Sequence, residues 1–426
     1  MGMKRLLIGL ILVCFCIGQA AFAIPAMDVD ATAAILADPI TNQVMYEENA
    51  RTKLPQASLT KIMTALLVAE SGCSMDDTVT VSESAMEGME HLSGTVTIEV
   101  GETFTVRQLL TLLMVASVNE AANVCAELVS GNIPAFVERM NERAAELGCE
   151  NTHFCNPHGL HEDDHYTTAY DVYLMARELQ KHEDVAEIYR QDRVVMDATN
   201  KSDERIFFST NSLISRYKEL GYVYRYATGM KTGTTTKAGM CLAATATKGE
   251  TSLISVILGA ARAPDGTKQS FAESARLLQW GFDHFSKKTL LEPSSPICEV
   301  KVDLSKDRDY VVAVPAHAYE TMMPNDFNPE QLEFIADVPA QVQAPIEKGQ
   351  VLGSVTLRYD GKDYTTMDLV AADSLERSMI LLVLHWIKLI FGSTVAKIIG
   401  AAVLLLIVIY IIASIRVNSK QKQRYR

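Results

Sequence analysis

Apolar residues recur with a helical period between Gln56 and Glu70. The repeated positions are i, i+3, i+4, i+7 and i+8, and they are occupied by Leu59, Ile62, Met63, Leu66 and Leu67. Such spacing places the five side chains on one stripe of a helix. Lys61 lies beside that stripe and follows Ser58 by three residues. The pattern therefore predicts a buried helix with a lysine next to its apolar face.

Strand patterns flank a mainly helical region. Residues 33–47 have the pattern of a hairpin, and apolar or alternating runs return in residues 230–260. Helical periods dominate between these segments as far as about Gln191, and another helix is predicted at residues 268–282. Strands at both ends with helices between and behind them predict an α+β fold, in which helices cover one antiparallel sheet.

One of the predicted helices has a clear beginning and end. Thr105 is followed three residues later by Gln108, which is a capping box at a helix start. Ser117, Val118 and Asn119 then interrupt the helical pattern. They are predicted to form a short turn between two helices, from which a hydroxyl and an amide project.

The rest of the chain predicts a second domain and a membrane-directed end. Residues 297–370 contain short alternating runs, with Asp360 and Gly361 as a hairpin turn, and indicate a small all-β domain. Residues 398–415 carry no charge and are just long enough to cross a bilayer, and a basic tail follows them. The stretch 379–391 suits a helix at the membrane interface or, alternatively, a buried amphipathic helix of the soluble part.

The first 23 residues are predicted to be an export signal. A charged start precedes an apolar run at residues 6–17, and Ala21, Phe22 and Ala23 form a cleavage site of small residues. Basic residues mark the cytoplasmic side of a membrane segment. We therefore expect the tail to lie inside the cell and the bulk of the chain to face outward.

Charge and cysteine content narrow the possible chemistry. The formal net charge is −13 although the tail is basic, which argues against nucleic-acid binding. Six of the 8 cysteines lie beyond the signal, and their spacing is not that of a metal site. We expect buried free thiols at these six positions, which are Cys73, Cys125, Cys149, Cys155, Cys241 and Cys298.

Ser58 and Lys61 have a spacing that suits nucleophilic catalysis. Residues at i and i+3 of a helix bring their β-carbons to about 5–6 Å. A serine hydroxyl needs a base to take its proton, and a lysine that burial keeps neutral can be that base. The positive end of the helix would also stabilise an oxyanion at Ser58. Taken alone, this spacing is more often an exposed lysine beside a capping serine.

Two further motifs support the catalytic interpretation. Ser117 and Asn119 lie on the predicted turn, and a K-T-G-T sequence begins a predicted strand at Lys231. Gly229 would let a substrate backbone approach the strand, while the lysine and the threonine after it offer a cation and a hydroxyl to a carboxylate. The ordered set S-x-x-K, S-x-N and K-T-G is the signature of penicillin-binding proteins and serine β-lactamases.

With these motifs the sequence resembles the low-molecular-mass penicillin-binding proteins that act as serine D-alanyl-D-alanine carboxypeptidases. The resemblance runs from about residue 33 to 282 and includes "LPQASLTKIMTALL", "LLTLLMVASVNEAA" and "GMKTGTTTKAGMCLAATA". It implies a β-lactamase/transpeptidase-like α+β domain, a small all-β domain and a transmembrane helix. The implied parts are a signal peptide (1–23), a carboxypeptidase domain (24–286), the all-β domain (293–375), an interfacial segment (378–392), the membrane helix (398–415) and a cytoplasmic tail (416–426).

The resemblance also implies an acyl-enzyme mechanism on the D-Ala-D-Ala end of peptidoglycan stem peptides. Ser58 would attack the penultimate carbonyl, and Lys61 would take its proton. Ser117, with Lys231 as a second candidate, would pass that proton to the departing D-alanine. No metal or organic cofactor is implied, and β-lactams would acylate the same serine.

Substrate binding is implied for the second and third motifs. Asn119 would hold the peptide, and Lys231 and Thr232 would bind its terminal carboxylate on the strand that contains Gly233. The backbone N–H groups of Thr234 and of the nucleophile would form the oxyanion hole. The protein would thus be a membrane-bound enzyme of cell-wall biogenesis.

The sequence departs from the family pattern at two places. The family commonly has an aspartate three residues before the lysine of the K-T-G motif, and this chain has Thr228 at that position. An arginine is expected where the chain has Ser270. Arg262 or Lys268 are the two candidates to replace that arginine in the carboxylate pocket.

Three alternative functions remain open at this point. A serine β-lactamase shares the three motifs, although a membrane anchor and a β-domain add nothing to its reaction. A metal site is conceivable in "HGLHEDDH", with His153, His158, His161 and His165 near Glu162, Asp163 and Asp164, but a polar loop is the simpler interpretation. The third is a wall-binding protein without catalysis.

Overall fold

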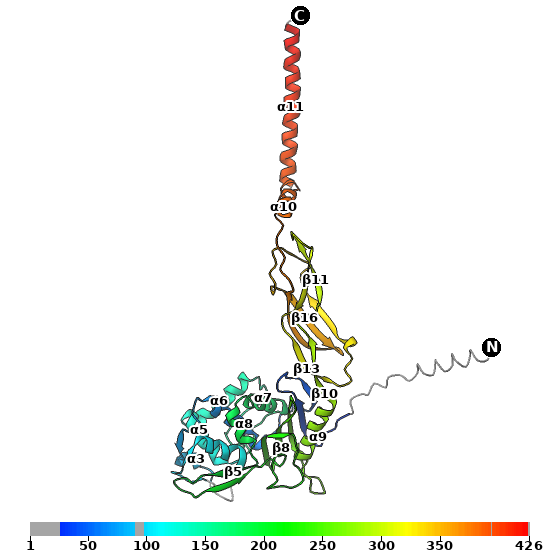
Figure 1. Ribbon diagram of the computed structural model, residues 1–426. Coiled ribbons are helices and arrows are strands. Elements are labelled where there is room, and N and C mark those ends of the chain that lie inside the picture. Colours follow the sequence, from blue (N-terminus) through cyan, green and yellow to red (C-terminus); the bar gives the residue numbers. More distant parts are fainter. Residues whose placement is uncertain (1–25, 90–97, 393, 425–426) are drawn as a thin grey trace, which may run out of the picture. The chain divides into compact units, whose positions relative to one another are not determined.

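The structure is a computed structural model, and it describes residues 26–89, 98–392 and 394–424 (Figure 1). The chain divides into two compact units, residues 1–288 with 321–327 and residues 289–320 with 328–426. The predicted export signal and the last two residues of the predicted cytoplasmic tail lie outside the described residues.

A five-stranded antiparallel sheet organises the first unit. Its strand order is β2-β1-β9-β8-β7, with β2 at Val44–Glu48, β1 at Ala33–Ala37, β9 at Thr251–Ala260, β8 at Gly239–Lys248 and β7 at Ala227–Thr235. β1 pairs with β9, so the first strand of the unit lies beside strands from its far end. The prediction of one antiparallel sheet built from both ends is therefore confirmed.

Helices cover both faces of this sheet. The helical segments are η1 (Ala57–Thr60), α2 (Lys61–Glu70), α3 (Glu83–Met86), α4 (Val106–Thr111), η2 (Leu112–Ala116), α5 (Asn119–Ser130), α6 (Ile133–Glu146), α7 (Ala169–Leu179), α8 (Glu183–Tyr189) and α9 (Gln269–His284). Alternate residues of β1 join two different apolar cores: Ile35 packs with the α2–α8 side and Leu36 with α9. Because both faces are covered, all five residues of β1 are buried and apolar.

Sequence analysis did not predict two short strand pairs in the first unit. β3 (Thr78–Thr80) pairs with β4 (Thr103–Thr105), and β5 (Arg193–Met196) pairs with β6 (Arg205–Phe208). The second pair depends on a long-range contact, because the fully buried Glu102 carboxylate accepts hydrogen bonds from Arg205 Nη2 and Thr199 Oγ1, each at 2.6 Å. Such a contact leaves no periodic signal in the sequence.

Before its two C-terminal helices, the second unit consists mainly of β-strands, as predicted. Six strands form a sheet in the order β14 (Glu333–Asp337), β16 (Val351–Tyr359), β17 (Lys362–Ala371), β12 (Tyr310–Pro315), β11 (Cys298–Asp303) and β15 (Gln341–Gln343). The division into two units falls inside β10 (Phe285–Leu291) and β13 (Tyr319–Pro324), which pair with each other. The short helix η3 spans Pro329–Gln331. Asp360 and Gly361 have φ angles of 49° and 72° and form the predicted hairpin turn between β16 and β17.

Two helices end the described chain, α10 (Met379–Gly392) and α11 (Thr394–Arg424). Residues Ala396–Arg416 of α11 form one helix long and apolar enough to cross a membrane, with a mean hydropathy of 3.0. In α10, the described side chains from Met379 to Phe391 are exposed except for half-buried Leu382. The interfacial helix and its alternative, a buried amphipathic helix, both stay predictions.

Removing the capping box should destabilise the first unit. Thr105 Oγ1 accepts from the Gln108 N–H at 3.1 Å, and Gln108 Oε1 accepts from the Thr105 N–H at 2.8 Å. We expect Thr105→Ala to lower the free energy of unfolding by about 1 kcal/mol, which corresponds to about 2–4 °C in melting temperature. Thr105→Ser keeps the accepting oxygen and is the matched control in calorimetry of the detergent-solubilised chain. Equal losses in both variants would contradict this role for the hydroxyl.

Candidate active site

Ser58 lies in η1, the 3₁₀ turn that leads directly into α2. Ala57 precedes it in the left-handed region, with φ 49°. Thr60 Oγ1 donates to the Ala57 carbonyl at 2.9 Å and lies 2.7 Å from His165 Nε2. Ser58 is half-buried and lines a pocket. The turn is thus fixed from beneath while the nucleophile candidate remains accessible.

The His165 ring supports that turn as a neutral imidazole. Its Nδ1 atom accepts a hydrogen bond from the Cys155 N–H at 3.0 Å. Since Nδ1 accepts, the proton of the neutral ring is on Nε2, which then donates to Thr60 Oγ1. Burial, with smaller contributions from His153 and His161, lowers the pKa of His165 to about 4. The ring therefore stays neutral throughout the neutral pH range.

Lys61 is fully buried and has three hydrogen-bond acceptors around its Nζ atom. Nζ lies 3.0 Å from Ser58 Oγ, 2.7 Å from Asn119 Oδ1 and 2.7 Å from the His158 carbonyl oxygen. Burial lowers the pKa of Lys61 to about 7, against a smaller opposite effect of Glu120. Near neutral pH the amine is thus present in both forms, as a general base requires.

Ser117 ends η2 in the left-handed conformation, with φ 64° and ψ 33°. This backbone turn separates η2 from α5, and Asn119 is the first residue of α5. Lys231 Nζ, on β7, donates to Ser117 Oγ at 2.8 Å and to the Thr232 carbonyl at 3.0 Å. Burial, and then the charges of Lys61 and Lys218, lower the pKa of Lys231 well below its usual range.

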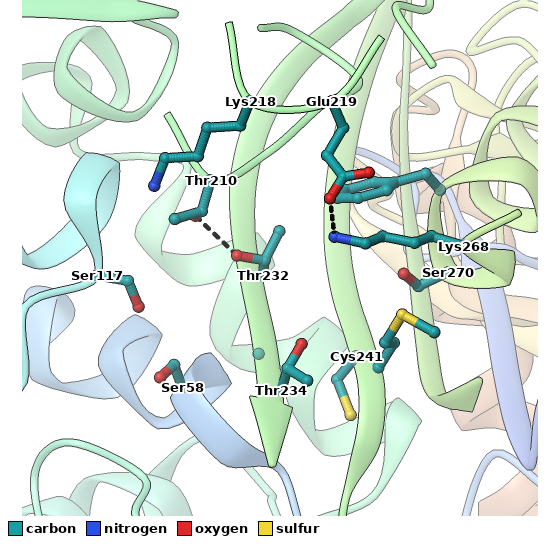
Figure 2. A pocket seen from close by; sticks show the side chains of 13 residues that line it. Ser58, Ser117, Thr210, Lys218, Glu219, Thr232, Thr234, Cys241, Lys268 and Ser270 are labelled. Atoms are coloured by element: carbon teal, nitrogen blue, oxygen red, sulfur yellow. Dashed lines mark hydrogen bonds and ion pairs between the residues drawn. The ribbon is translucent and has the colours of Figure 1, made fainter. Parts of the chain in front are cut away.

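Strand β7 lies directly against the turn that carries Ser58. A β-carbon added to Gly233 would stand 2.9 Å from the Gln56 carbonyl oxygen and 3.0 Å from the Ser58 nitrogen. Only glycine allows this approach. Thr232 and Thr234 line the pocket in front of Ser58, and Thr232 Oγ1 donates to Thr210 Oγ1 at 2.7 Å (Figure 2).

The structure thus brings all three predicted motifs to one pocket. Its walls come from η1, the Ser117 turn, β7, β8, the segment before β7 and the start of α9 (Figure 2). The lining residues are Ser58, Ser117, Thr210, Lys218, Glu219, Thr232, Gly233, Thr234, Met240, Cys241, Lys268, Ser270 and Phe271. Lys61, Asn119 and Lys231 support this pocket through the hydrogen bonds described above.

The structure corrects the reason given for Gly229. A β-carbon at this position would stand 2.4 Å from Cδ2 of the Tyr189 ring. Gly229 is therefore required by the packing of β7 against α8, and the close approach at the reaction centre belongs to Gly233. Of the two arginine substitutes, Lys268 lines the pocket with Ser270, whereas Arg262 is exposed and donates to the Gly266 carbonyl at 2.7 Å.

The histidine-rich loop supports the nucleophile turn. Its backbone contacts α2 through the His158 carbonyl on Lys61 and the Pro157 carbonyl, which accepts from Thr64 Oγ1 at 2.6 Å. Within the described ranges, His, Cys, Asp and Glu side chains form no group of three or more that could hold a metal ion. The loop histidines that are buried, His158 and His165, take part in the hydrogen bonds of this support.

Several contributors to the pocket were missed by sequence analysis. Thr210, Lys218 and Glu219 lie in a segment without periodicity, and a backbone carbonyl such as that of His158 has no sequence signal at all. The six cysteines of the described chain are free, as expected, but only three of them are buried: Cys125, Cys149 and Cys241. One of the buried thiols, Cys241, lines the pocket, and burial raises its pKa to about 11.

Comparisons with known proteins agree on one family. The sequence profile of the D-alanyl-D-alanine carboxypeptidases matches residues 20–262, and that of the penicillin-binding protein 5 C-terminal domain matches residues 285–377. The D-alanyl-D-alanine carboxypeptidase DacF of Bacillus subtilis is 32% identical over 88% of this chain and 95% of its own length. For DacC of Escherichia coli the identity is 31%, over 85% and 89%.

Solved structures show the same likeness in three dimensions. Penicillin binding protein 5 from Haemophilus influenzae is 28% identical, with a TM-score of 0.67 over 83% of this chain and 100% of that one. The D-alanyl-D-alanine carboxypeptidase DacD from Francisella tularensis has a TM-score of 0.67 over 84% and 97%, at 24% identity. The second similarity concerns the fold alone.

Gly159 is the loop residue whose replacement should most disturb the nucleophile turn. Its φ is +89°, and an added β-carbon would stand 1.9 Å from the Ala57 carbonyl oxygen. We expect Gly159→Ala to lower the free energy of unfolding by more than about 3 kcal/mol, since backbone must move. Gly148→Ala is the control, with φ +80° and open space, and should cost about 1–2 kcal/mol. Equal losses in urea unfolding would contradict the steric argument.

Proposed function

The chain belongs to the D-alanyl-D-alanine carboxypeptidase family, and on that premise we propose that it removes the terminal D-alanine of peptidoglycan stem peptides through an acyl-enzyme at Ser58. The observation that carries this assignment is the 3.0 Å contact between Ser58 Oγ and the buried Lys61 amine. Ser58 lines a pocket together with Ser117 and the K-T-G strand. These are the parts that acyl transfer by a serine requires.

Acylation begins with proton transfer to Lys61. In its neutral form Lys61 takes the proton of Ser58, whose oxygen attacks the penultimate carbonyl carbon of the peptide. The resulting oxyanion accepts hydrogen bonds from the backbone N–H groups of Ser58 and Thr234. The carbon–nitrogen bond then breaks, and Ser117, hydrogen-bonded to Lys231, delivers its proton to the amine of the leaving D-alanine. Ser117 regains a proton from Lys61, which returns Lys61 to its neutral form before deacylation.

Deacylation uses the same groups in reverse. A water molecule attacks the ester carbonyl carbon and gives its proton to Lys61, and Ser58 takes a proton back as the ester bond breaks. Asn119 holds Lys61 through its carbonyl oxygen at 2.7 Å. We therefore assign its NH₂ group to a carbonyl of the substrate peptide. Thr232 and Thr234 present hydroxyls to the end of the peptide on β7.

The location that we propose follows from both ends of the chain. Residues 1–23 direct export, residues 398–415 cross the membrane, and residues 416–426 remain in the cytoplasm. The catalytic domain, residues 24–286, then acts on the outer side, with residues 378–392 at the membrane interface. The all-β domain, residues 293–375, serves as a spacer or docking module. Trimming of stem peptides would limit the donors for cross-linking.

The first test is the covalent intermediate itself. We expect the full chain in detergent to gain the mass of a penicillin on Ser58 for many minutes, and to release D-alanine from a peptide ending in D-Ala-D-Ala. Ser58→Ala should lose both reactions. Disappearance of the drug without a lasting adduct would identify a β-lactamase. An unchanged rate of D-alanine release in Ser58→Ala would refute the assignment.

The second test is the pH dependence of acylation. Because the pKa of Lys61 is lowered to about 7, protonation below this pH removes the base. The second-order rate of acylation should fall about tenfold per pH unit below 7 and level off above it. Lys61→Arg, which keeps its proton at every pH, should remove the reaction. A rate that is constant from about pH 5 to 9 would contradict Lys61 as the base.

A further inference from the structure

The pocket contains a group of charged residues at the end formed by the segment before β7 and the start of α9. Lys218 and Glu219 come from that segment, and Lys268 precedes α9 (Figure 2). Lys268 Nζ forms an ion pair with Glu219 Oε1. The Lys268 N–H also donates to the Tyr222 hydroxyl at 2.8 Å. Two contacts thus connect the segment to α9.

Lys218 differs from its charged neighbours Glu219 and Lys268, which pair with each other. Within the described part of the chain its ammonium group makes neither a hydrogen bond nor an ion pair, and Figure 2 shows it pointing away from the Glu219–Lys268 pair. Partial burial of its amine, and then the charge of Lys268, lower the pKa of Lys218. Unlike Lys61 and Lys231, however, Lys218 is exposed at the rim of the pocket, where a substrate anion can reach it. The Glu219 charge, which would repel an anionic substrate, is neutralised by Lys268.

The other lysines of the site are poorly suited to hold a carboxylate. Lys61 and Lys231 are fully buried, and burial lowers the pKa of both. Lys231 is also engaged by Ser117 and by the Thr232 carbonyl. A buried amine with a lowered pKa is a good proton carrier, but it is a weak source of fixed positive charge.

The position where the family resemblance leads us to expect an arginine cannot supply the charge either. Ser270 is 3% exposed and lines the pocket, but its side chain is short and neutral. Arg262 lies outside the pocket lining and donates to the Gly266 carbonyl. A substrate that ends in a carboxylate therefore needs a cation from another part of the chain.

We propose that Lys218 binds the C-terminal carboxylate of the substrate, and that Lys268 is a positioning residue that neutralises Glu219 and holds its segment against α9. The hydroxyls of Thr210, Thr232 and Thr234 complete this end of the pocket. The inference rests on the proposed carboxypeptidase function and adds the residue that recognises the terminal carboxylate of the peptide. Lys218 thereby determines the preference for a free carboxylate.

The test compares two peptides that differ only at this group. One ends in D-Ala-D-Ala with a free carboxylate, and the other carries the C-terminal amide. Mass spectrometry of the shortened peptide gives kcat/KM for both with the full chain in detergent. We expect Lys218→Gln to lower kcat/KM for the acid roughly ten- to hundredfold, the range for loss of a charged hydrogen bond, with little change for the amide. Lys218→Arg should keep the preference.

Three further variants separate recognition from folding. Arg262→Gln is the matched control, because it removes a cation outside the pocket lining, and it should keep the wild-type ratio of acid to amide. Lys268→Gln should reduce that ratio by freeing the Glu219 carboxylate, and adding Glu219→Gln should restore it. A structural role alone would not give this restoration, so its failure would overturn the positioning role of Lys268.

The outcomes distinguish this inference from the proposed function. A wild-type ratio in Lys218→Gln, or a lost ratio in Arg262→Gln, would overturn Lys218 as the carboxylate-binding residue while D-alanine release continued. A wild-type chain that shortened neither peptide would instead overturn the proposed function and this inference with it.

Discussion

Burial of the Lys61 amine is the constraint on which the catalytic unit depends. An ammonium group taken out of water is costly unless each of its protons finds an acceptor. Here the three acceptors come from three segments: Ser58 in η1, Asn119 at the start of α5 and the His158 carbonyl of the histidine-rich loop. The same burial that makes this arrangement necessary lowers the pKa of Lys61 to about 7 and so provides the base.

The segments that surround the Lys61 amine adopt uncommon backbone conformations on both sides of the site. Ala57 and Ser117 both have positive φ angles, which are uncommon for residues with a β-carbon. Each is held by surrounding structure: the Ala57 carbonyl accepts from Thr60, and Ser117 ends a buried π-turn and contacts Lys231. Functional geometry is thus stabilised by the packing of the helices around it.

The sequence was sufficient for the parts of the site that belong to continuous patterns. The sheet, the capping box, the turn at Ser117 and the proposed catalytic groups, Ser58 and Lys61, all follow from period, spacing and motif. The site also depends on contacts between residues distant in sequence, which a pattern cannot show. One such contact is the hydrogen bond from Lys61 to the His158 carbonyl. Another is the ion pair of Glu219 with Lys268, because the sequence does not show that Glu219 pairs with Lys268 and not with its neighbour Lys218. For Gly229 the steric need was predicted but its partner was wrong.

The positions of the lysines explain why a residue at the rim of the pocket is proposed to bind the substrate carboxylate. Burial turns a lysine into a base by removing its charge, so one residue cannot serve well as both base and counter-ion. Lys231 is better suited to carry a proton than to bind an anion, since burial and the charges of Lys61 and Lys218 all lower its pKa. Binding a carboxylate needs an accessible amine that is not engaged by other groups of the site. Lys218 is exposed and lines the pocket, although partial burial and the charge of Lys268 lower its pKa. Its own charge favours the neutral form of Lys231.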